Sequence, residues 1–217
     1  MFKKLFATLL LITSFNVFAD PQIGQDFDKT AQPTATENPT KIEVNEIFWY
    51  GCIHCYHMDP VLEAWAKKLP ADVVFKRTPG LPNPSWAPMA KAYYTLEELK
   101  LLGKLHTPLF DAVNKDKILN PTDEKAIIDW ITQQSGLDKS KIESNFNSFS
   151  MNNKLNRAAQ TFKASGATGV PTLVIDGQYL TSSSMAGGNE QALKVVDYII
   201  AKVRAGKAKA VVPAKKK

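Results

Sequence analysis

The chain has 217 residues, with 27 lysines and arginines against 21 aspartates and glutamates, which gives a formal net charge of +6 at neutral pH. Five of the lysines lie in residues 207–217, so the remainder is close to neutral and lacks the basic surface typical of nucleic-acid-binding proteins. The length is sufficient to bury a core, and two cysteines are too few for a disulfide-stapled scaffold.

The N-terminal segment has the pattern of an export signal peptide. Lys3 and Lys4 precede a short apolar stretch, Leu5–Phe18, and Val17–Ala19 forms a small-residue cleavage site. An uncleaved membrane anchor is the alternative, but a span needs roughly 20 apolar residues and polar side chains interrupt this stretch. We therefore expect that residues 1–19 are removed on export and that the mature protein is soluble.

The first structured region is predicted to be a central strand. Residues 20–40 form a polar, proline-containing lead-in, in which Ile23–Phe27 is predicted to be a short edge strand. From Ile42 to Tyr50 the apolar residues first alternate and then occupy both faces, as in a strand covered on both sides. Glu46 falls among these apolar residues, where a charged carboxylate is costly to bury. It either has a buried role or reaches solvent near the end of the strand.

The two cysteines follow this strand directly, in the sequence Cys52-Ile53-His54-Cys55. The spacing brings both sulfurs together when Cys55 lies one turn into a helix, and it places Cys52 at the helix N-terminus, where free N–H groups favour a thiolate. A C-x-x-C motif between a strand and a helix predicts a redox-active dithiol. A purely structural disulfide is the alternative, although so short a loop restricts little chain entropy.

Two histidines lie close to the cysteines. His54, between them, is placed where a ring N–H or a positive charge stabilises a thiolate, whereas His57 is expected to face solvent. A metal site is the competing interpretation, but structural zinc sites usually draw on two separated ligand pairs and this chain has no second pair. Distant His106 is a poor substitute, so we expect no metal.

The remaining elements follow in chain order. A helix is predicted over 52–68 and a strand over 73–77. Helical spacing then predicts five helices with no strand between them, over 86–102, 105–113, 122–136 (capped by Thr122), 139–146 and 151–162. Strands return at 171–175 and 178–180 around an Asp176-Gly177 turn, followed by a helix over 190–204 and a disordered lysine-rich tail over 207–217.

These features resemble the thioredoxin superfamily and, within it, the exported DsbA-type thiol:disulfide oxidoreductases. The resemblance rests on an aromatic strand ending in C-x-H-C, on Pro60 five residues after the second cysteine, on the helical insertion and on Gly169–Thr172. It implies an α/β fold with a mixed sheet, in which a thioredoxin-like domain formed by residues 41–83 and 165–206 is interrupted by an all-helical insertion over 84–164.

The resemblance also implies roles for individual residues. Cys52 is expected to be the exposed, attacking sulfur and Cys55 the buried sulfur that resolves the mixed disulfide. Glu46 matches a family position where an acid lies under the dithiol and helps to manage the proton of the inner sulfur. Pro171 matches a proline that follows a cis peptide bond, and it presents the backbone of Val170 to an extended substrate.

The implied function is that of an oxidase. It donates the disulfide to reduced, unfolded, exported proteins in the periplasm and is reoxidised by a DsbB-like, quinone-linked membrane oxidase, with no cofactor beyond the dithiol. We expect a monomer, because residues 20–40 cannot supply the dimerisation domain of disulfide isomerases. Family members often carry proline where Ile53 stands, and this position tunes the redox potential. An exported reductase or isomerase therefore remains open, as does a non-enzymatic chaperone with an incidental dithiol.

Overall fold

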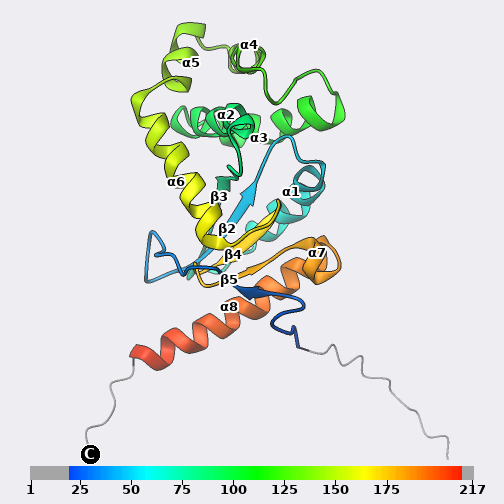
Figure 1. The fold of residues 1–217 in the computed structure, drawn as a ribbon, viewed down its shortest axis with the longest axis vertical. Helices are drawn as coiled ribbons and strands as arrows, with labels where there is room; N and C mark the ends of the chain where they lie inside the picture. Colours follow the sequence, from blue (N-terminus) through cyan, green and yellow to red (C-terminus); the bar gives the residue numbers. More distant parts are fainter. Residues whose placement is uncertain (1–19, 212–217) are drawn as a thin grey trace, which may run out of the picture.

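The computed structural model describes residues 20–211, with side chains up to residue 208. The predicted signal peptide and residues 212–217 lie outside this range. A five-stranded mixed sheet lies in the middle of the molecule, with α2–α5 gathered at one end and α8 at the other (Figure 1). No helix of the described part has the length and apolar character needed to cross a membrane.

The elements alternate between sheet and helix, with one long helical interval. The strands are β1 (Asp28–Lys29), β2 (Ile42–Phe48), β3 (Val73–Pro79), β4 (Thr172–Ile175) and β5 (Tyr179–Thr181). The helices are α1 (Ile53–Ala66), α2 (Ala87–Glu98), α3 (Leu102–Phe110), α4 (Glu124–Ser135), α5 (Lys139–Phe146), α6 (Phe149–Ser165), α7 (Ser183–Ala186) and α8 (Asn189–Val211). A 3-10 turn, η1 (Pro84–Trp86), precedes α2, and a π-helical turn, η2 (Asp111–Lys115), continues α3.

The sheet order is β1-β5-β4-β2-β3, so β2 lies inside the sheet. All seven residues of β2 are buried, which agrees with the predicted central strand. β2 runs parallel to β3 and antiparallel to β4. In this register Glu46 lies directly opposite Arg77 on one side and Leu173 on the other. The register therefore places two oppositely charged residues side by side across the β2–β3 pair.

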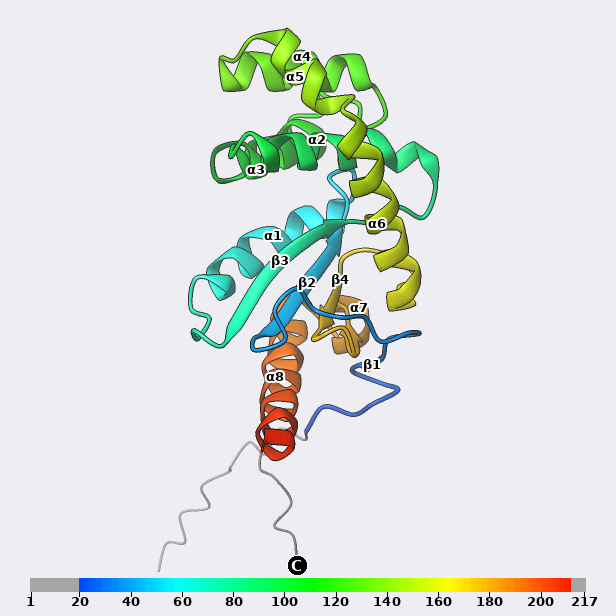
Figure 2. The ribbon, with the colours of Figure 1, turned by 90° about the vertical axis from the view of Figure 1, so that its left-hand side faces the viewer.

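Helices cover both faces of the sheet. Val44 of β2 shares a core with Met58 and Leu62 of α1 and with the apolar side of α8. α6 runs along the opposite side of the sheet from α1 (Figure 2). The amphipathic pattern of each helix explains this layering, since each buries one apolar stripe against the strands.

The long interval between β3 and β4 contains helices joined by loops and no strand, which confirms the predicted helical insertion. Its core is continuous with the end of β2, because Phe48, Tyr50 and Cys55 belong to the same buried cluster as the apolar residues of α2–α5. The insertion therefore packs directly on the segment that carries the cysteines.

Several predicted boundaries are wrong for local reasons. The helix expected over 86–102 already ends at Glu98, and the next one begins at Leu102 instead of 105, because Lys100 adopts a left-handed backbone (φ 57°) between α2 and α3. The cap of α4 is Asp123 rather than Thr122: the Asp123 side chain accepts a hydrogen bond from the N–H of Ala126 at 3.0 Å. Thr122 instead donates its hydroxyl to Asn120.

The two ends of the described chain also differ from expectation. The edge strand expected at Ile23–Phe27 is only an isolated bridge, and the paired strand is β1, which bonds to β5. Residues 207–211 belong to α8 and are not disordered. Lys207 explains the extension, because its Nζ lies 2.8 Å from Asp176 and also donates to the backbone carbonyls of Pro39 and Lys41.

Candidate active site

The two cysteines lie at the junction between β2 and α1. Cys52 is the N-cap residue of α1, with an extended backbone (φ −97°, ψ 115°), and its Sγ accepts a hydrogen bond from the N–H of Cys55 at 3.4 Å. Cys52 is partly exposed, whereas Cys55 is fully buried one turn into the helix. Both are free, so the structure represents the reduced pair. The junction therefore presents one sulfur to solvent and protects the other.

The surroundings of Cys52 favour its thiolate. The pKa of Cys52 is lowered from 9.0 to about 6, chiefly by the hydrogen bond from the thiol of Cys55. Burial opposes this effect, while the backbone N–H groups of Cys55 and His54 and the charge of His54 add to it. Because the thiolate is the reactive form in disulfide exchange, Cys52 is the sulfur suited to nucleophilic attack.

Cys55 behaves in the opposite way. Burial raises its pKa well above 9.0, and its hydrogen bond to Cys52 and the charge of Glu46 raise it further. Cys55 is therefore held as a thiol in the reduced pair, and it must receive a proton whenever it leaves a disulfide.

The loop before β4 lies on the other side of Cys52. The Val170–Pro171 peptide bond is cis, as the family resemblance implied. The Sγ of Cys52 lies 3.4 Å from the carbonyl oxygen of Val170, to which its thiol can donate. The hydroxyl of Thr172 donates to the carbonyl of Gly169 at 2.8 Å and so holds this loop. The backbone of Val170 is thus presented directly beside the accessible sulfur.

A cavity of about 620 Å³ opens next to Val170 and Pro171. Its lining connects His54 and His57 of α1 with Val170 and Pro171, and it continues along the molecule to β1. Ile53 is 43 % exposed immediately after Cys52. The cavity therefore offers space for a chain segment alongside the accessible sulfur.

Glu46 is buried, with 1 % of its surface exposed, so the alternative that it escapes to solvent is wrong. Burial raises its pKa from 4.5 to about 7, and the charge of Arg77 only partly offsets that rise. One carboxylate oxygen, Oε2, lies 2.9 Å from Nε of Arg77, whereas Oε1 has no hydrogen-bond partner within the described chain. Near neutral pH this carboxyl group is therefore partly protonated.

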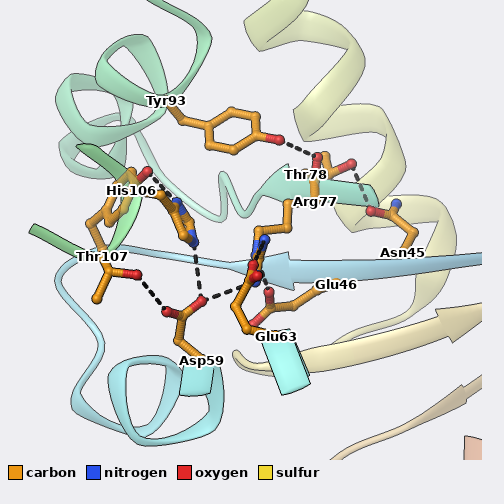
Figure 3. A network of polar contacts seen from close by, with 10 residues as sticks. Asn45, Glu46, Asp59, Glu63, Arg77, Thr78, Tyr93, His106 and Thr107 are labelled. Carbon is orange, nitrogen blue, oxygen red and sulfur yellow. Dashed lines mark hydrogen bonds and ion pairs between the residues drawn. The ribbon is translucent and has the colours of Figure 1, made fainter. Parts of the chain in front are cut away.

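Arg77 is the centre of a buried ionic cluster, shown in Figure 3. Besides Glu46, it contacts Asp59 through Nη2 at 2.9 Å and Glu63 through Nη1 at 2.8 Å. The β2–β3 register supplies Arg77 and Glu46, and successive turns of α1 supply the other two acids. The planar guanidinium group of Arg77 has three nitrogen donors, and each of them binds a different carboxylate.

Residues of α3 complete the cluster. The hydroxyl of Thr107 donates to Asp59 at 3.3 Å, and Nε2 of His106 lies 3.2 Å from the same carboxylate. Burial alone would raise the pKa of Asp59, but His106 and Arg77 hold it below its usual value. Burial lowers the pKa of His106, and its ring joins the two sides of the cluster, with Nε2 facing Asp59 and Nδ1 2.6 Å from the Tyr50 hydroxyl oxygen.

Two aromatic rings cover the turn that leads to the cysteines. Trp49 stacks on Trp86 from η1, with ring centroids 4.3 Å apart and planes at 10°. A side chain at Gly51 would place its Cβ 2.4 Å from the Trp49 ring. Glycine is required at this position because the indole crosses the space that a Cβ would occupy.

The structure brings together Cys52, Cys55, His54, Glu46, Val170 and Pro171, the residues predicted as the site. Arg77, Asp59 and Glu63 were missed. One signal was available for Asp59, because it lies four residues after Cys55 on the buried side of α1, where an acid needs a partner. Nothing in the local pattern identified Arg77 as that partner. No group of three or more potential ligands in the described chain is arranged to hold a metal ion.

The amino-acid sequence is similar to one family of known proteins. Residues 57–199 match the model of the DSBA-like thioredoxin domain. The thiol:disulfide interchange protein DsbA of Pseudomonas aeruginosa is 37 % identical over 202 residues, covering 92 % of this chain and 95 % of the relative. The DsbA of Azotobacter vinelandii is 36 % identical over 188 residues, covering 86 % of each chain.

Solved structures show the same similarity in three dimensions. The crystal structure of Pseudomonas aeruginosa DsbA superposes with a TM-score of 0.81 at 35 % identity and covers 87 % of this chain and 97 % of that one. The oxidoreductase DsbA from Xylella fastidiosa superposes with a TM-score of 0.78 at 27 % identity, covering 85 % and 98 %.

Proposed function

This chain belongs to the DsbA family and is a protein-disulfide oxidoreductase, and on that premise we propose that its Cys52–Cys55 disulfide oxidises pairs of cysteines in exported, unfolded proteins. The observation that carries the proposal is the opposite ionisation preference of the two sulfurs. The pKa of Cys52 falls to about 6, while that of Cys55 rises. Stabilising the Cys52 thiolate stabilises the reduced protein, so the disulfide accepts electrons readily.

The reaction proceeds in two exchanges. A substrate thiolate attacks Sγ of Cys52, the bond to Cys55 breaks, and the electron pair passes to Cys55, which takes up a proton. A second substrate thiolate then attacks the substrate sulfur of the mixed disulfide, and Cys52 leaves as a thiolate. The substrate loses two electrons and gains a disulfide, and the two cysteines gain those electrons.

Glu46 is proposed to supply the proton for Cys55. Its pKa is about 7, whereas that of the Cys55 thiol lies well above 9.0, so transfer from the carboxyl group to the leaving thiolate is favourable. His54 acts on the other cysteine, because its positive charge favours the Cys52 thiolate.

Val170 and Pro171 are proposed to position the substrate. Val170 lies beside the accessible sulfur, and the adjoining cavity of about 620 Å³ extends from His54 to β1. The backbone of Val170 is proposed to pair with the backbone of an extended substrate. Such pairing does not depend on the identity of the substrate side chains, which suits an enzyme that acts on many unfolded chains.

The setting follows from the same family membership and from the N-terminal segment. The pattern of residues 1–19 supports export by a cleaved signal peptide and action in the periplasm. The substrates are reduced, unfolded, exported proteins, and a DsbB-like, quinone-linked membrane oxidase removes the two electrons. The monomer uses no cofactor beyond its dithiol.

Substitution of Cys52 tests the proposal. Cys52→Ala is expected to reduce oxidation of a reduced, unfolded substrate protein to the uncatalysed rate, because no accessible sulfur remains to form the mixed disulfide. Cys55→Ala keeps the nucleophile and is expected to accumulate the mixed disulfide when glutathione disulfide is added. Catalysis retained by Cys52→Ala would contradict the proposal. In a titration of the native protein against glutathione, a strongly reducing potential would contradict the oxidase direction.

A further inference from the structure

The cluster around Arg77 contains more acid than base. Three carboxylates, those of Glu46, Asp59 and Glu63, each occupy a different nitrogen of one guanidinium, at 2.9, 2.9 and 2.8 Å. The other polar contacts of the cluster come from His106 and Thr107, and burial lowers the pKa of His106, which disfavours a second cation there. Three anions around one cation are costly in a buried site, so one carboxyl group is expected to hold a proton.

The contacts show which acid takes that proton. Asp59 accepts hydrogen bonds from three residues, which is a set of donors suited to an anion. The side chain of Glu63 is 38 % exposed and lines two cavities that reach the surface, so water solvates it. Glu46 has a single donor, is 1 % exposed and leaves Oε1 without a partner.

We infer that Glu63 is a positioning residue: by holding Nη1 of Arg77 at the surface side of the cluster, it leaves the buried carboxyl group of Glu46 as the place where the spare proton resides. No hydrogen bond or ion pair joins Glu63 to either cysteine in the described chain, so it acts through Arg77 and its own charge. The use of this proton in the reaction rests on the proposed function: Glu46 would donate it to Cys55 when Cys55 leaves the disulfide.

The charged and titratable groups around Glu46 set the sign of the effect. They come from β3, α1, α2 and the turn after β2, and they are Arg77, Asp59, Glu63, Cys55, Tyr93 and Tyr50. Of these, Arg77 favours the Glu46 anion, while Asp59 and Glu63 oppose it. Removing the charge of Glu63 therefore leaves more of the Arg77 charge for Glu46, which will release its proton at lower pH.

The direct test follows the titration of the Glu46 carboxyl group by NMR of isotope-labelled glutamate side chains. Its signal is identified by its absence from Glu46→Gln. Glu63→Gln is expected to lower the Glu46 midpoint by on the order of one pH unit, as for the loss of one nearby charge. Glu124→Gln is the matched control, because that carboxylate is similarly exposed (42 %) and pairs with Lys91 away from the cluster. An unchanged midpoint in Glu63→Gln, or an equal shift in Glu124→Gln, would overturn the inference.

A kinetic measurement separates positioning from general damage. Glu63→Gln is expected to slow reduction of the Cys52–Cys55 disulfide by a small dithiol at neutral pH, with the pH profile of the step displaced in the same direction as the Glu46 midpoint. In the Glu46→Gln background the same substitution is expected to have no further effect. An equal effect in both backgrounds would refute action through Glu46. The carboxyl titration needs no substrate oxidation, so it stands even if Cys52→Ala contradicts the proposed function.

Discussion

Cys52 and Cys55 are chemically identical and three residues apart, yet their pKa values move in opposite directions. Cys52 receives hydrogen bonds at the start of α1, and each of these stabilises a negative charge. Cys55 lies inside the core, where burial and the charge of Glu46 both oppose ionisation. The difference arises from position along one helical turn, so the same spacing that joins the sulfurs also separates their roles.

The two buried acids beside Arg77 show the same dependence on donors. Asp59 has an arginine, a histidine and a threonine around its carboxylate, and its pKa stays below the usual value. Glu46 has one donor and an unpartnered oxygen, and burial raises its pKa to about 7. A single shared cation is thus not sufficient to keep both acids ionised.

The raised pKa of Glu46 predicts how stability varies with pH. Between pH 4.5 and about 7 the unfolded chain ionises Glu46 while the folded chain keeps it protonated, so the free energy of unfolding falls as the pH rises through this window. At about 1.4 kcal/mol per pKa unit, Glu46 accounts for a loss on the order of 3 kcal/mol. Urea denaturation of the oxidised protein measures this without interference from thiol titration, and Glu46→Gln is expected to remove the loss.

Asp129→Asn is the control for this measurement. Hydrogen bonds from Lys125 and Lys139 lower the pKa of Asp129 to about 2, so it titrates outside the window. Its replacement is expected to leave the loss in place. An identical pH dependence in the native protein and Glu46→Gln would show that the carboxyl group is not protonated in the folded state.

At the scale of the element, the turn between β2 and α1 does most to define the site. β2 is buried along its whole length and ends where Trp49 crosses over Gly51, and α1 begins immediately after Cys52. The indole therefore fixes the path of the chain just before the nucleophile. This explains why an aromatic run followed by glycine precedes the motif.

The start of α4 gives a prediction for a single element. Asp123→Ala is expected to destabilise the protein by about 1 kcal/mol, because the N–H of Ala126 loses its capping acceptor. Thr122→Ala removes only a side-chain contact with Asn120 and is expected to cost less. Thermal or urea unfolding of the two variants decides between them, and a larger effect of Thr122→Ala would reinstate threonine as the cap.

At the scale of the whole molecule, the helical insertion contributes directly to the site. His106 from α3 contacts both Tyr50 in the β2–α1 turn and Asp59 in α1. Asn114 from η2 donates to the carbonyl of Tyr50 at 2.7 Å. The insertion therefore braces the turn that carries Cys52, in addition to enclosing its own core.

The C-terminal helix gives a prediction at the same scale. Lys207 connects α8 to Asp176, whose side chain is 4 % exposed, and to the lead-in. Lys207→Met is expected to reduce the free energy of unfolding by roughly 1–3 kcal/mol, because it leaves a buried carboxylate short of a donor. Lys141→Met replaces an exposed lysine and serves as the control. Equal stability of the two variants in urea would show that the end of α8 contributes nothing to the fold.

The sequence by itself determined the features that depend on short spacing. The dithiol, the position of Cys52 at a helix start, the alternation of β2 and the Asp176-Gly177 turn are all readable because the residues involved are neighbours along the chain. The family resemblance then supplied the cis peptide bond before Pro171, which no local pattern indicates.

Only the tertiary structure decided the surroundings of Glu46. Its burial, its pairing with Arg77 and the approach of His106 depend on strand register and on how the insertion docks. These contacts join residues 31 and 47 positions apart in the chain, at Arg77–Glu46 and at His106–Asp59. Periodicity reports which face of an element is buried, but it does not report which charged residue of another element meets it there, because that partner is selected by packing of the whole chain.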